Sequence, residues 1–256
     1  MALAARTGAW AKAGGGAPTA KDYVQDGLIA MWDGIENAGW GMHDSNATVW
    51  KDLVGGDDLT VPPSLVWMDS CLSFDGKYSA YNLEIPHNKI GLVWTCECVY
   101  VIKEQGANYK GLFGGRLNTG GGGWLQVYGL NYWSTMSGGW SMGNGARNDI
   151  TISGNPSLAN LIILNKTNYL VLGQKNDKTL IAGTDGVISV EKQITSVVNT
   201  THKGFMLGRG YDSPVVLSQQ RSLKSDIHTF RLYNRTLGAS EIAANYAIDK
   251  ARFNLP

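Results

Sequence analysis

Hydrophobic and polar residues alternate in short runs along most of this chain. Alternation at every second residue is typical of a β-strand with one buried face. The run at residues 226–233, near the end of the chain, is a clear example. It predicts Ile227, Thr229 and Arg231 on one face of a strand, with Phe230 and Leu232 on the other. This strand is expected to close the domain, because a helix follows it.

The spacing of apolar residues changes from two to about 3.6 after a turn at residues 234–236. Gly238 is an acceptable N-cap, and Glu241 stands three residues later, where its side chain can bond back to the cap. The apolar positions of the predicted helix are Leu237, Ile242, Tyr246 and Ile248. The polar residues interpreted as fixing this turn and cap are Arg231, Tyr233, Asn234, Arg235 and Glu241.

Further short strands are predicted along the chain, separated by turns rich in Gly and Asn. They lie at residues 27–32, 71–76, 95–102, 111–115, 124–130, 161–164, 169–173, 179–190 and 204–210, with a hairpin turn at Asp185-Gly186. Many short strands with one terminal helix predict an all-β fold, a two-sheet antiparallel jelly-roll β-sandwich. The predicted core comprises Leu28, Ala30, Trp32, Leu72, Phe74, Val99, Val101, Ile163, Leu170, Leu172, Phe205, Leu207, Phe230 and Leu232.

Four groups of residues carry a resemblance to a known family. They are Gly27-Leu28-x-x-x-Trp32, Trp50-x-Asp52-x-x-Gly55-Gly56, Phe74-Asp75-Gly76 and the closing unit from Ile227 to Ile242. In this order they resemble the laminin-G-like jelly rolls of the concanavalin A-like lectin and glucanase superfamily, of the kind found in phage or prophage proteins of gut bacteria. The resemblance spans residues 27–250 and implies a concanavalin A-like sandwich. That superfamily includes lectins, glycosidases, adhesins and virion proteins, so the fold does not select a function.

Residues 1–22 differ from the rest in composition. Ala, Gly, Lys and Pro dominate, and only Leu3 and Trp10 could anchor the segment. This composition predicts a flexible, extended arm, followed by one jelly-roll domain over residues 23–256. Because a Gly-rich arm is usually ordered by a partner, we expect residues 1–22 to bind other virion or assembly subunits, and the protein to form a homo-oligomer.

The net charge, the apolar runs and the cysteine content limit the kinds of partner and the compartment that we expect. The net charge is +1, so no global field favours nucleic acid or an acidic membrane surface. No apolar run is long enough for a signal peptide or a membrane span, which predicts synthesis in a bacterial cytoplasm and no membrane insertion. Three cysteines do not make a disulfide framework in a domain of this size, so buried free thiols are expected.

Aromatic and amide residues gather in a Gly-rich region at residues 124–148. Sugar rings present flat C–H faces that stack on Trp and Tyr, while amide and guanidinium groups bond hydroxyls. The candidate glycan-binding residues are Trp124, Tyr128, Tyr132, Trp133, Trp140, Asn144 and Arg147. In the alternative interpretation, Trp124, Gln126 and Tyr128 line one sheet face and Trp140 covers an end of the sandwich.

The sequence offers little for catalysis. Retaining glycosidases need two carboxylates about 5 Å apart. In the β-glucanase branch of the superfamily that the chain resembles, these carboxylates come from one strand as Glu-x-Asp-x-x-Glu or a close variant. None of the six Glu residues here has Asp two positions later. We therefore expect no catalytic residues and no enzyme activity.

No cofactor is expected either, and Ca²⁺ is the one ion for which oxygen ligands are present, at Asp57, Asp58, Asp212 and in the loop at residues 37–46. His228 stands where laminin-G-like relatives commonly carry an acidic residue. This departure weakens the case for a cation site carried over from the family.

These observations favour a non-catalytic attachment module. The predicted protein is a decoration, fibre or tail protein on the virion surface of a phage or prophage, with a lectin-like domain that binds a bacterial surface glycan or polysaccharide. Two alternatives stay open. One is a purely structural virion or assembly protein with no glycan ligand, and the other is a glycoside hydrolase.

Overall fold

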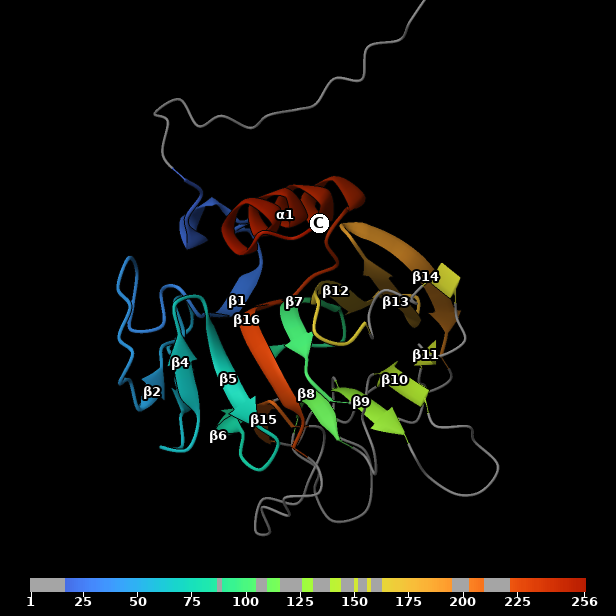
Figure 1. The fold of residues 1–256 in the computed structure, drawn as a ribbon. Helices are drawn as coiled ribbons and strands as arrows, with labels where there is room; N and C mark the ends of the chain where they lie inside the picture. Colours follow the sequence, from blue (N-terminus) through green and yellow to red (C-terminus); the bar gives the residue numbers. More distant parts are fainter. Residues whose placement is uncertain are drawn as a thin grey trace, which may run out of the picture.

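Two antiparallel β-sheets pack face to face, and one helix lies across the outer face of the first sheet (Figure 1). The structure is a computed structural model that describes residues 17–86, 89–104, 110–115, 126–130, 139–143, 150–151, 156–157, 163–194, 203–209 and 222–256. The predicted fold class is confirmed: the chain is an all-β, two-sheet antiparallel sandwich with a short C-terminal helix.

The first sheet has the strand order β14-β13-β12-β7-β16-β5-β4, and β1 also pairs with β16. Its strands are β1 (Leu28–Asp33), β4 (Val66–Met68), β5 (Cys71–Asp75), β7 (Trp94–Ile102), β12 (Thr167–Gln174), β13 (Thr179–Thr184), β14 (Val187–Gln193) and β16 (Lys224–Tyr233). The closing strand β16 is central. It pairs with β7 on one side and with β5 and then β1 on the other.

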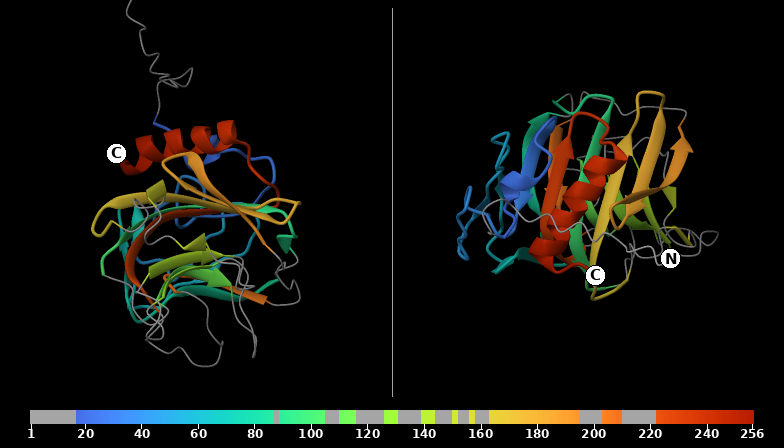
Figure 2. Two further views of the ribbon diagram at one scale, coloured as in Figure 1. Left: turned by 90° about the vertical axis from the view of Figure 1, so that its right-hand side faces the viewer. Right: turned by 90° about the horizontal axis from the view of Figure 1, so that it is seen from above.

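The second sheet has the order β11-β10-β9-β8-β15-β6-β3-β2. Its strands are β2 (Val49–Trp50), β3 (Leu59–Thr60), β6 (Ala80–Pro86), β8 (Gly111–Gly115), β9 (Gln126–Leu130), β10 (Gly139–Gly143), β11 (Ile150–Thr151) and β15 (Lys203–Leu207). The helical elements are a 3-10 turn η1 (Ala20–Asp22) and the helix α1 (Ala239–Phe253). The side view shows α1 on the first sheet and the second sheet beneath it (Figure 2).

An aromatic cluster joins the two sheets. Trp32 of β1 stacks on Phe205 of β15, with ring centroids 5.2 Å apart and planes 17° apart. Phe230 of β16 lies 5.0 Å from Phe205 and 4.9 Å from Phe113 of β8, measured between ring centroids. All four side chains are buried. Burial of each such ring contributes about 1.5–3 kcal/mol, so this cluster is a major source of the cohesion between the sheets.

A second hydrophobic cluster fills the space between the first sheet and α1. It comprises Ala20, Tyr23, Leu28, Met31, Leu53, Val99, Tyr169, Val171, Tyr233, Leu237, Ile242, Phe253 and Leu255. The central strands of the first sheet are therefore buried on both faces. This explains why β7, with only Val101 partly exposed, reads as a nearly continuous hydrophobic run.

The predicted helix start is confirmed. α1 begins at Ala239, and the backbone N–H of Gly238 donates to Oε2 of Glu241 over 2.8 Å. Arg235 donates to both oxygens of Glu241 over 2.9 and 2.6 Å, which ties the turn to the first helical turn. Arg235 and Glu241 therefore fix the turn and the cap as predicted.

The predicted faces of the closing strand are wrong in one respect. Ile227 belongs to the core between the sheets, together with Phe230 and Leu232, whereas Arg231 lies beneath α1. A register shift between Ile227 and Thr229 in the pairing with β7 is the cause. An extra residue, His228, reverses the alternation of the strand, and a two-residue periodicity cannot reveal such a bulge.

The predicted strand at residues 161–164 is also wrong where the structure describes it. Ile163 and Leu164 are 38% and 43% exposed, and only an isolated bridge joins Leu164 to Ile102. A short apolar run does not by itself distinguish a strand from a loop that passes over the surface. Ile163 is accordingly not part of the core.

The three cysteines are free and buried, as predicted. Burial raises the pKa of all three thiols, that of Cys71 to about 12. Thiols with such raised pKa values are poor nucleophiles, and their role is packing.

Candidate functional site

The sequence-predicted glycan cluster lies mostly outside the described residues. Trp124, Tyr132, Trp133, Asn144 and Arg147 fall in segments that the structure does not describe. Tyr128 lies on β9 and Trp140 on β10, two neighbouring strands at one side of the second sheet. The cluster as a whole therefore stays a prediction.

Strand register separates the two described positions. Tyr128 pairs with Ser141, whereas Trp140 pairs with Gly129. Directly paired residues share a sheet face and successive residues alternate, so positions 128 and 140 belong to opposite faces. Val127 pairs with both Met142 and the core residue Phe113, which assigns position 140 to the core-facing side. Position 128 belongs to the outer face of the sheet.

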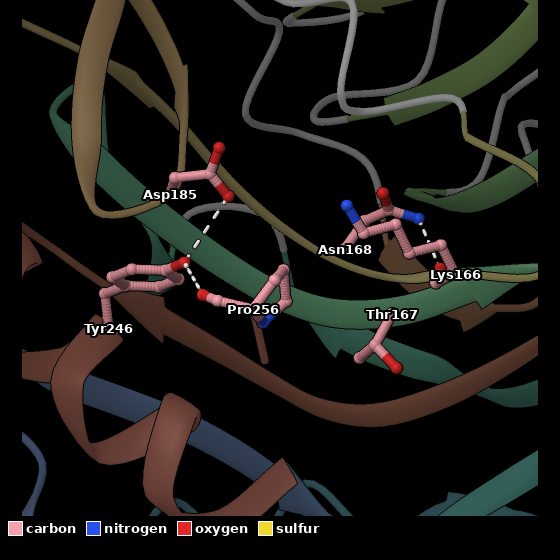
Figure 3. Close-up of a pocket in the computed structure, with 6 residues that line it drawn as sticks. All are labelled: Lys166, Thr167, Asn168, Asp185, Tyr246 and Pro256. Carbon is pink, nitrogen blue, oxygen red and sulfur yellow. Dashed lines mark hydrogen bonds between the residues drawn. The ribbon is translucent and has the colours of Figure 1, made fainter. Parts of the chain in front are cut away.

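A cavity of about 290 Å³ opens at the junction of α1 with the first sheet (Figure 3). Its lining residues are Lys166, Thr167, Asn168, Asp185, Tyr246 and Pro256. They come from the start of β12, the turn between β13 and β14, the middle of α1 and the last residue of the chain. Sequence reasoning missed this cavity, because no motif links residues that only the tertiary fold brings together.

The turn between β13 and β14 is fixed against the helix. Asp185 and Gly186 both have positive φ, 54° and 76°, which matches the predicted two-residue hairpin turn. A Cβ atom on Gly186 would lie 2.8 Å from Cβ of Tyr246, so only glycine fits this contact. The contact holds the turn, and with it Asp185, at a set position on the wall of the cavity.

The polar groups of the cavity stand on two sides. The Tyr246 hydroxyl donates toward Oδ1 of Asp185 over 3.5 Å and toward the carbonyl oxygen of Pro256 over 3.3 Å. Burial, followed by the Asp185 charge, raises the pKa of Tyr246, so its hydroxyl keeps its proton at neutral pH. Across from these groups Asn168 is anchored by its amide, which donates to the carbonyl of Lys166 over 2.6 Å. Figure 3 shows the two sides facing one another.

Behind the cavity lies a buried charge network centred on Arg231. Its guanidinium donates to Glu97 over 3.0 Å and to both oxygens of Asp249 over 2.9 and 2.6 Å. All three side chains are fully buried. The hydroxyls of Tyr23 and Tyr169 donate to Asp249 and Glu97, respectively. Arg231 was expected to fix a turn, and this expectation is wrong: the bulge at His228 turns it under α1, where it joins the helix to the sheet.

The network reaches the cavity through aromatic contact. The ring of Tyr169 packs on that of Tyr246, with centroids 5.1 Å apart. The helix is also tied at its far end, where Arg252 donates to Asp33 over 2.6 and 3.0 Å. Burial raises the pKa of Glu97 and Asp33, while the neighbouring guanidinium groups oppose that rise. These carboxylates hold α1 on the sheet and are inaccessible to a substrate.

The candidate calcium ligands have other partners where they are described. Asp57 is paired with Lys89, and Asp58 with Lys51 over 2.6 Å. Asp44 caps the backbone of Asn46 over 2.8 Å within the loop. Over the described ranges no group of three or more His, Cys, Asp or Glu side chains is arranged to hold a metal. Asp212 lies outside them.

Comparison with known proteins gives the fold. No model of a known protein family matches the sequence, and no curated protein matches it. Trypanosoma rangeli sialidase in complex with sialic acid is similar, with a TM-score of 0.62 and 20% identity over 88% of this chain and 33% of the sialidase chain. The chain thus spans about a third of the length of the sialidases that it matches.

Two further solved structures are single domains or binding regions. Domain 4 of a GH43 extracellular arabinanase from Geobacillus stearothermophilus, in complex with arabinotriose, has a TM-score of 0.58 and 12% identity over 86% of this chain and 98% of that domain. The binding domain of paraclostridial mosquitocidal protein 1 has a TM-score of 0.51 and 14% identity over 86% of this chain and 52% of that one. At these identities the likeness shows the fold, a β-sandwich consistent with the concanavalin A-like class.

Among the described helices, none is both long and apolar enough to cross a membrane.

Proposed function

We propose that this chain is a non-catalytic attachment domain that binds a glycan. The observation that carries the proposal is the match to the arabinanase domain, whose structure contains arabinotriose and which the alignment covers almost completely. A sandwich of this size holds an oligosaccharide in that protein, which supports the same role for the sandwich of this chain. The likeness is one of fold, and one fold hosts many functions, so the ligand is decided by a binding experiment.

The proposed binding surface is the outer face of the second sheet near β9. The candidate residues Trp124, Tyr132, Trp133, Asn144 and Arg147 are close in sequence to β9 and β10. Tyr128 occupies an outer-face position by register, which suits stacking on a sugar ring. Trp140 occupies a core-facing position, so within the cluster its expected role is packing.

The burial of the paired carboxylates among the described residues supports binding of a glycan without hydrolysis. A retaining glycosidase needs two carboxylates that reach the scissile bond. Glu97 and Asp249 do lie close together, both bound to Arg231, but they are fully buried beneath α1. Their arrangement serves to hold the helix.

The test is a glycan array followed by titration calorimetry on the full chain, with and without Ca²⁺. We expect binding to at least one bacterial surface polysaccharide or oligosaccharide and no release of sugar. The absence of binding to every glycan in both conditions would overturn the proposal. Turnover that is abolished by one carboxylate substitution would favour the alternative, a glycoside hydrolase.

Two substitutions test the position of the binding surface. Tyr128→Ala should weaken glycan binding about tenfold or more without lowering Tm, because position 128 is on the outer face of the sheet by register, where an aromatic ring can stack on a sugar. Trp140→Ala should instead lower the unfolding free energy by about 2 kcal/mol or more, because position 140 is on the core-facing side of the sheet by register. Calorimetric titration and thermal unfolding of both variants separate the two roles. The reverse pattern would place the surface elsewhere.

The biological setting proposed is the surface of a phage or prophage virion. Two features support this setting: the sequence resemblance and the arm at residues 1–22. We propose that the arm binds neighbouring virion subunits and that the protein forms a homo-oligomer. The sandwich then binds a bacterial surface glycan. A purely structural virion protein is the alternative. Loss of assembly on removing the arm, combined with no glycan binding by the intact chain, would favour that alternative.

A further inference from the structure

The cavity between α1 and the β13–β14 turn has features of a small-ligand site that the proposed glycan surface does not use. It lies against the first sheet, whereas β9 and Tyr128 belong to the second. Its volume of about 290 Å³ corresponds to roughly ten liquid-water volumes. A cavity of this size has room for a single sugar residue.

The lining of the cavity carries charges of both signs, which suits a hydroxyl-rich ligand without a charge of its own. Asp185 and the Pro256 carbonyl offer acceptors on one side, and Lys166 and Thr167 offer donors on the other. A carboxylate accepts several hydrogen bonds at once, and an ammonium group donates three. Asp185 would repel an anionic ligand, and Lys166 would repel a cationic ligand. Sugar hydroxyls both donate and accept, so they satisfy both sides.

Two of the six lining side chains, those of Tyr246 and Asn168, are held in place by their neighbours. Tyr246 is fixed by the close approach of Gly186 on one side and by its contact with Tyr169 on the other. Asn168 is 5% exposed and anchored by two hydrogen bonds of its amide, to the carbonyls of Ile163 and Lys166. Side chains held in place in this way lose little freedom on binding, which favours affinity in a small site.

We propose that this cavity is a second saccharide site, which takes a single neutral monosaccharide unit such as the terminal residue of a glycan. The inference rests on the proposed glycan-binding role of the domain, but it concerns a separate surface. Two sites on opposite sheets would let one domain hold two chains of a polysaccharide, or two points of one chain, with a gain in avidity.

The test uses the full isotopically labelled chain and a panel of neutral hexoses and pentoses, one uronic acid and one amino sugar, in NMR titrations. We expect a neutral sugar to shift the backbone signals of Lys166–Asn168, Asp185, Gly186 and Tyr246. Asp185→Asn removes the charge of an acceptor, and Tyr246→Phe removes the hydroxyl group that donates toward Asp185. Each substitution should therefore weaken the binding of the neutral sugar about tenfold. Asp69→Asn is the matched control: an exposed Asp in the β4–β5 turn, with no expected effect.

Each outcome decides a separate point. Oligosaccharide binding that is unchanged in Asp185→Asn and Tyr246→Phe, without shifts at the cavity, overturns the second site and leaves the proposed function standing. Binding of only the uronic acid or only the amino sugar overturns the assignment to a neutral unit. Failure of the whole chain to bind any sugar overturns both proposals together. Thermal unfolding of each variant shows that its fold is intact.

Discussion

The attachment of the helix α1 to the first sheet depends on Arg231. Arg231 is fully buried and satisfies two carboxylates from different elements, Glu97 on β7 and Asp249 on α1. A buried ion pair contributes little net stability over an apolar substitute, but removal of one partner leaves charge stranded in a medium of low polarity. Truncation of Arg231 should therefore lower the free energy of unfolding strongly, even if the intact ion pairs contribute little net stability.

Arg231→Ala should lower the free energy of unfolding by about 3–5 kcal/mol, because Glu97 and Asp249 lose their common partner. Arg235→Ala is the matched control, since Arg235 pairs with Glu241 and Asp26 at the surface and should cost about 1 kcal/mol or less. Urea unfolding of both variants measures the difference. Equal effects would contradict the central position given to Arg231.

His228 should make the stability of the domain depend on pH. Partial burial lowers the pKa of His228 in the folded state, although the hydrogen bond that its Nδ1–H donates to the Ser70 carbonyl opposes this. The unfolded chain then binds the proton more readily than the folded one. Stability is full above the unfolded pKa of about 6.5 and falls as the pH drops below it toward the lowered folded pKa.

The measurement is urea unfolding at pH 7.5 and at pH 5 for the natural chain and for His228→Gln. We expect the natural chain to lose more stability than the variant between these two values, and the difference isolates this one group. A parallel loss in both proteins would mean that other groups cause the pH dependence.

At the scale of elements, the hairpin of β13 and β14 is held against α1 by one close contact. Gly186 and Gly91 have the same positive φ of 76°, but a Cβ on Gly186 would meet Tyr246 at 2.8 Å, while a Cβ on Gly91 would meet nothing within 4 Å. The two positions therefore share backbone strain and differ in sterics. This pair separates the two effects of a glycine substitution.

Gly186→Ala should destabilise the domain by about 1 kcal/mol more than Gly91→Ala, since the backbone cost is common to both and only the first displaces Tyr246. Thermal or urea unfolding of the two variants gives the comparison. If both lose the same amount, the hairpin moves away from the helix without cost and the wall of the cavity is not preorganised.

The sequence predicted the elements better than their relation to one another. Alternating residues sufficed for β16, and Gly238 with Glu241 sufficed for the start of α1. The bulge at His228 was not predictable, because one extra residue in a strand leaves no trace in composition. Arg231 was misassigned for the same reason. The apolar residues Ile163 and Leu164 look like core in sequence, and only the tertiary structure shows them at the surface.

The cavity was even less predictable from the sequence than the faces of the closing strand. Asp185 was predicted as a turn residue and Tyr246 as an apolar helix position, and both assignments describe the local chain correctly. Their meeting with Lys166 and Pro256 depends on how α1 lies across β12 and the β13–β14 hairpin. Local patterns fix local structure, whereas a site made from distant segments requires the packing of the whole sheet.

At the scale of the whole molecule, the packed domain begins at Ala20, close to the first described residue. Ala20 is buried, and its N–H donates to Glu36 over 2.8 Å. Asp22 accepts a hydrogen bond from the N–H of Thr19 over 2.7 Å. A truncation that tests the arm should therefore stop at residue 16, since a cut at residue 22 also removes structural contacts.

Removal of residues 1–16 should leave Tm within about 2 °C of the full chain and, on the proposed role of the arm, reduce the oligomeric state. Removal of residues 1–22 should lower Tm as well, because Ala20 leaves the cluster under α1. Light scattering and thermal unfolding distinguish these results. An unchanged oligomer after the shorter cut would show that the arm does not mediate assembly.

The junction of Tyr23 with Asp249 has a mechanical consequence. The Tyr23 hydroxyl donates to Asp249 over 2.7 Å, and the last residue, Pro256, accepts from Tyr246 of the same helix. Entry and exit of the described chain thus meet on the side that α1 covers, away from the second sheet (Figure 2). Force applied between the two ends would load this junction first and peel the helix away, while the hydrogen bonds between the strands still carried no tension.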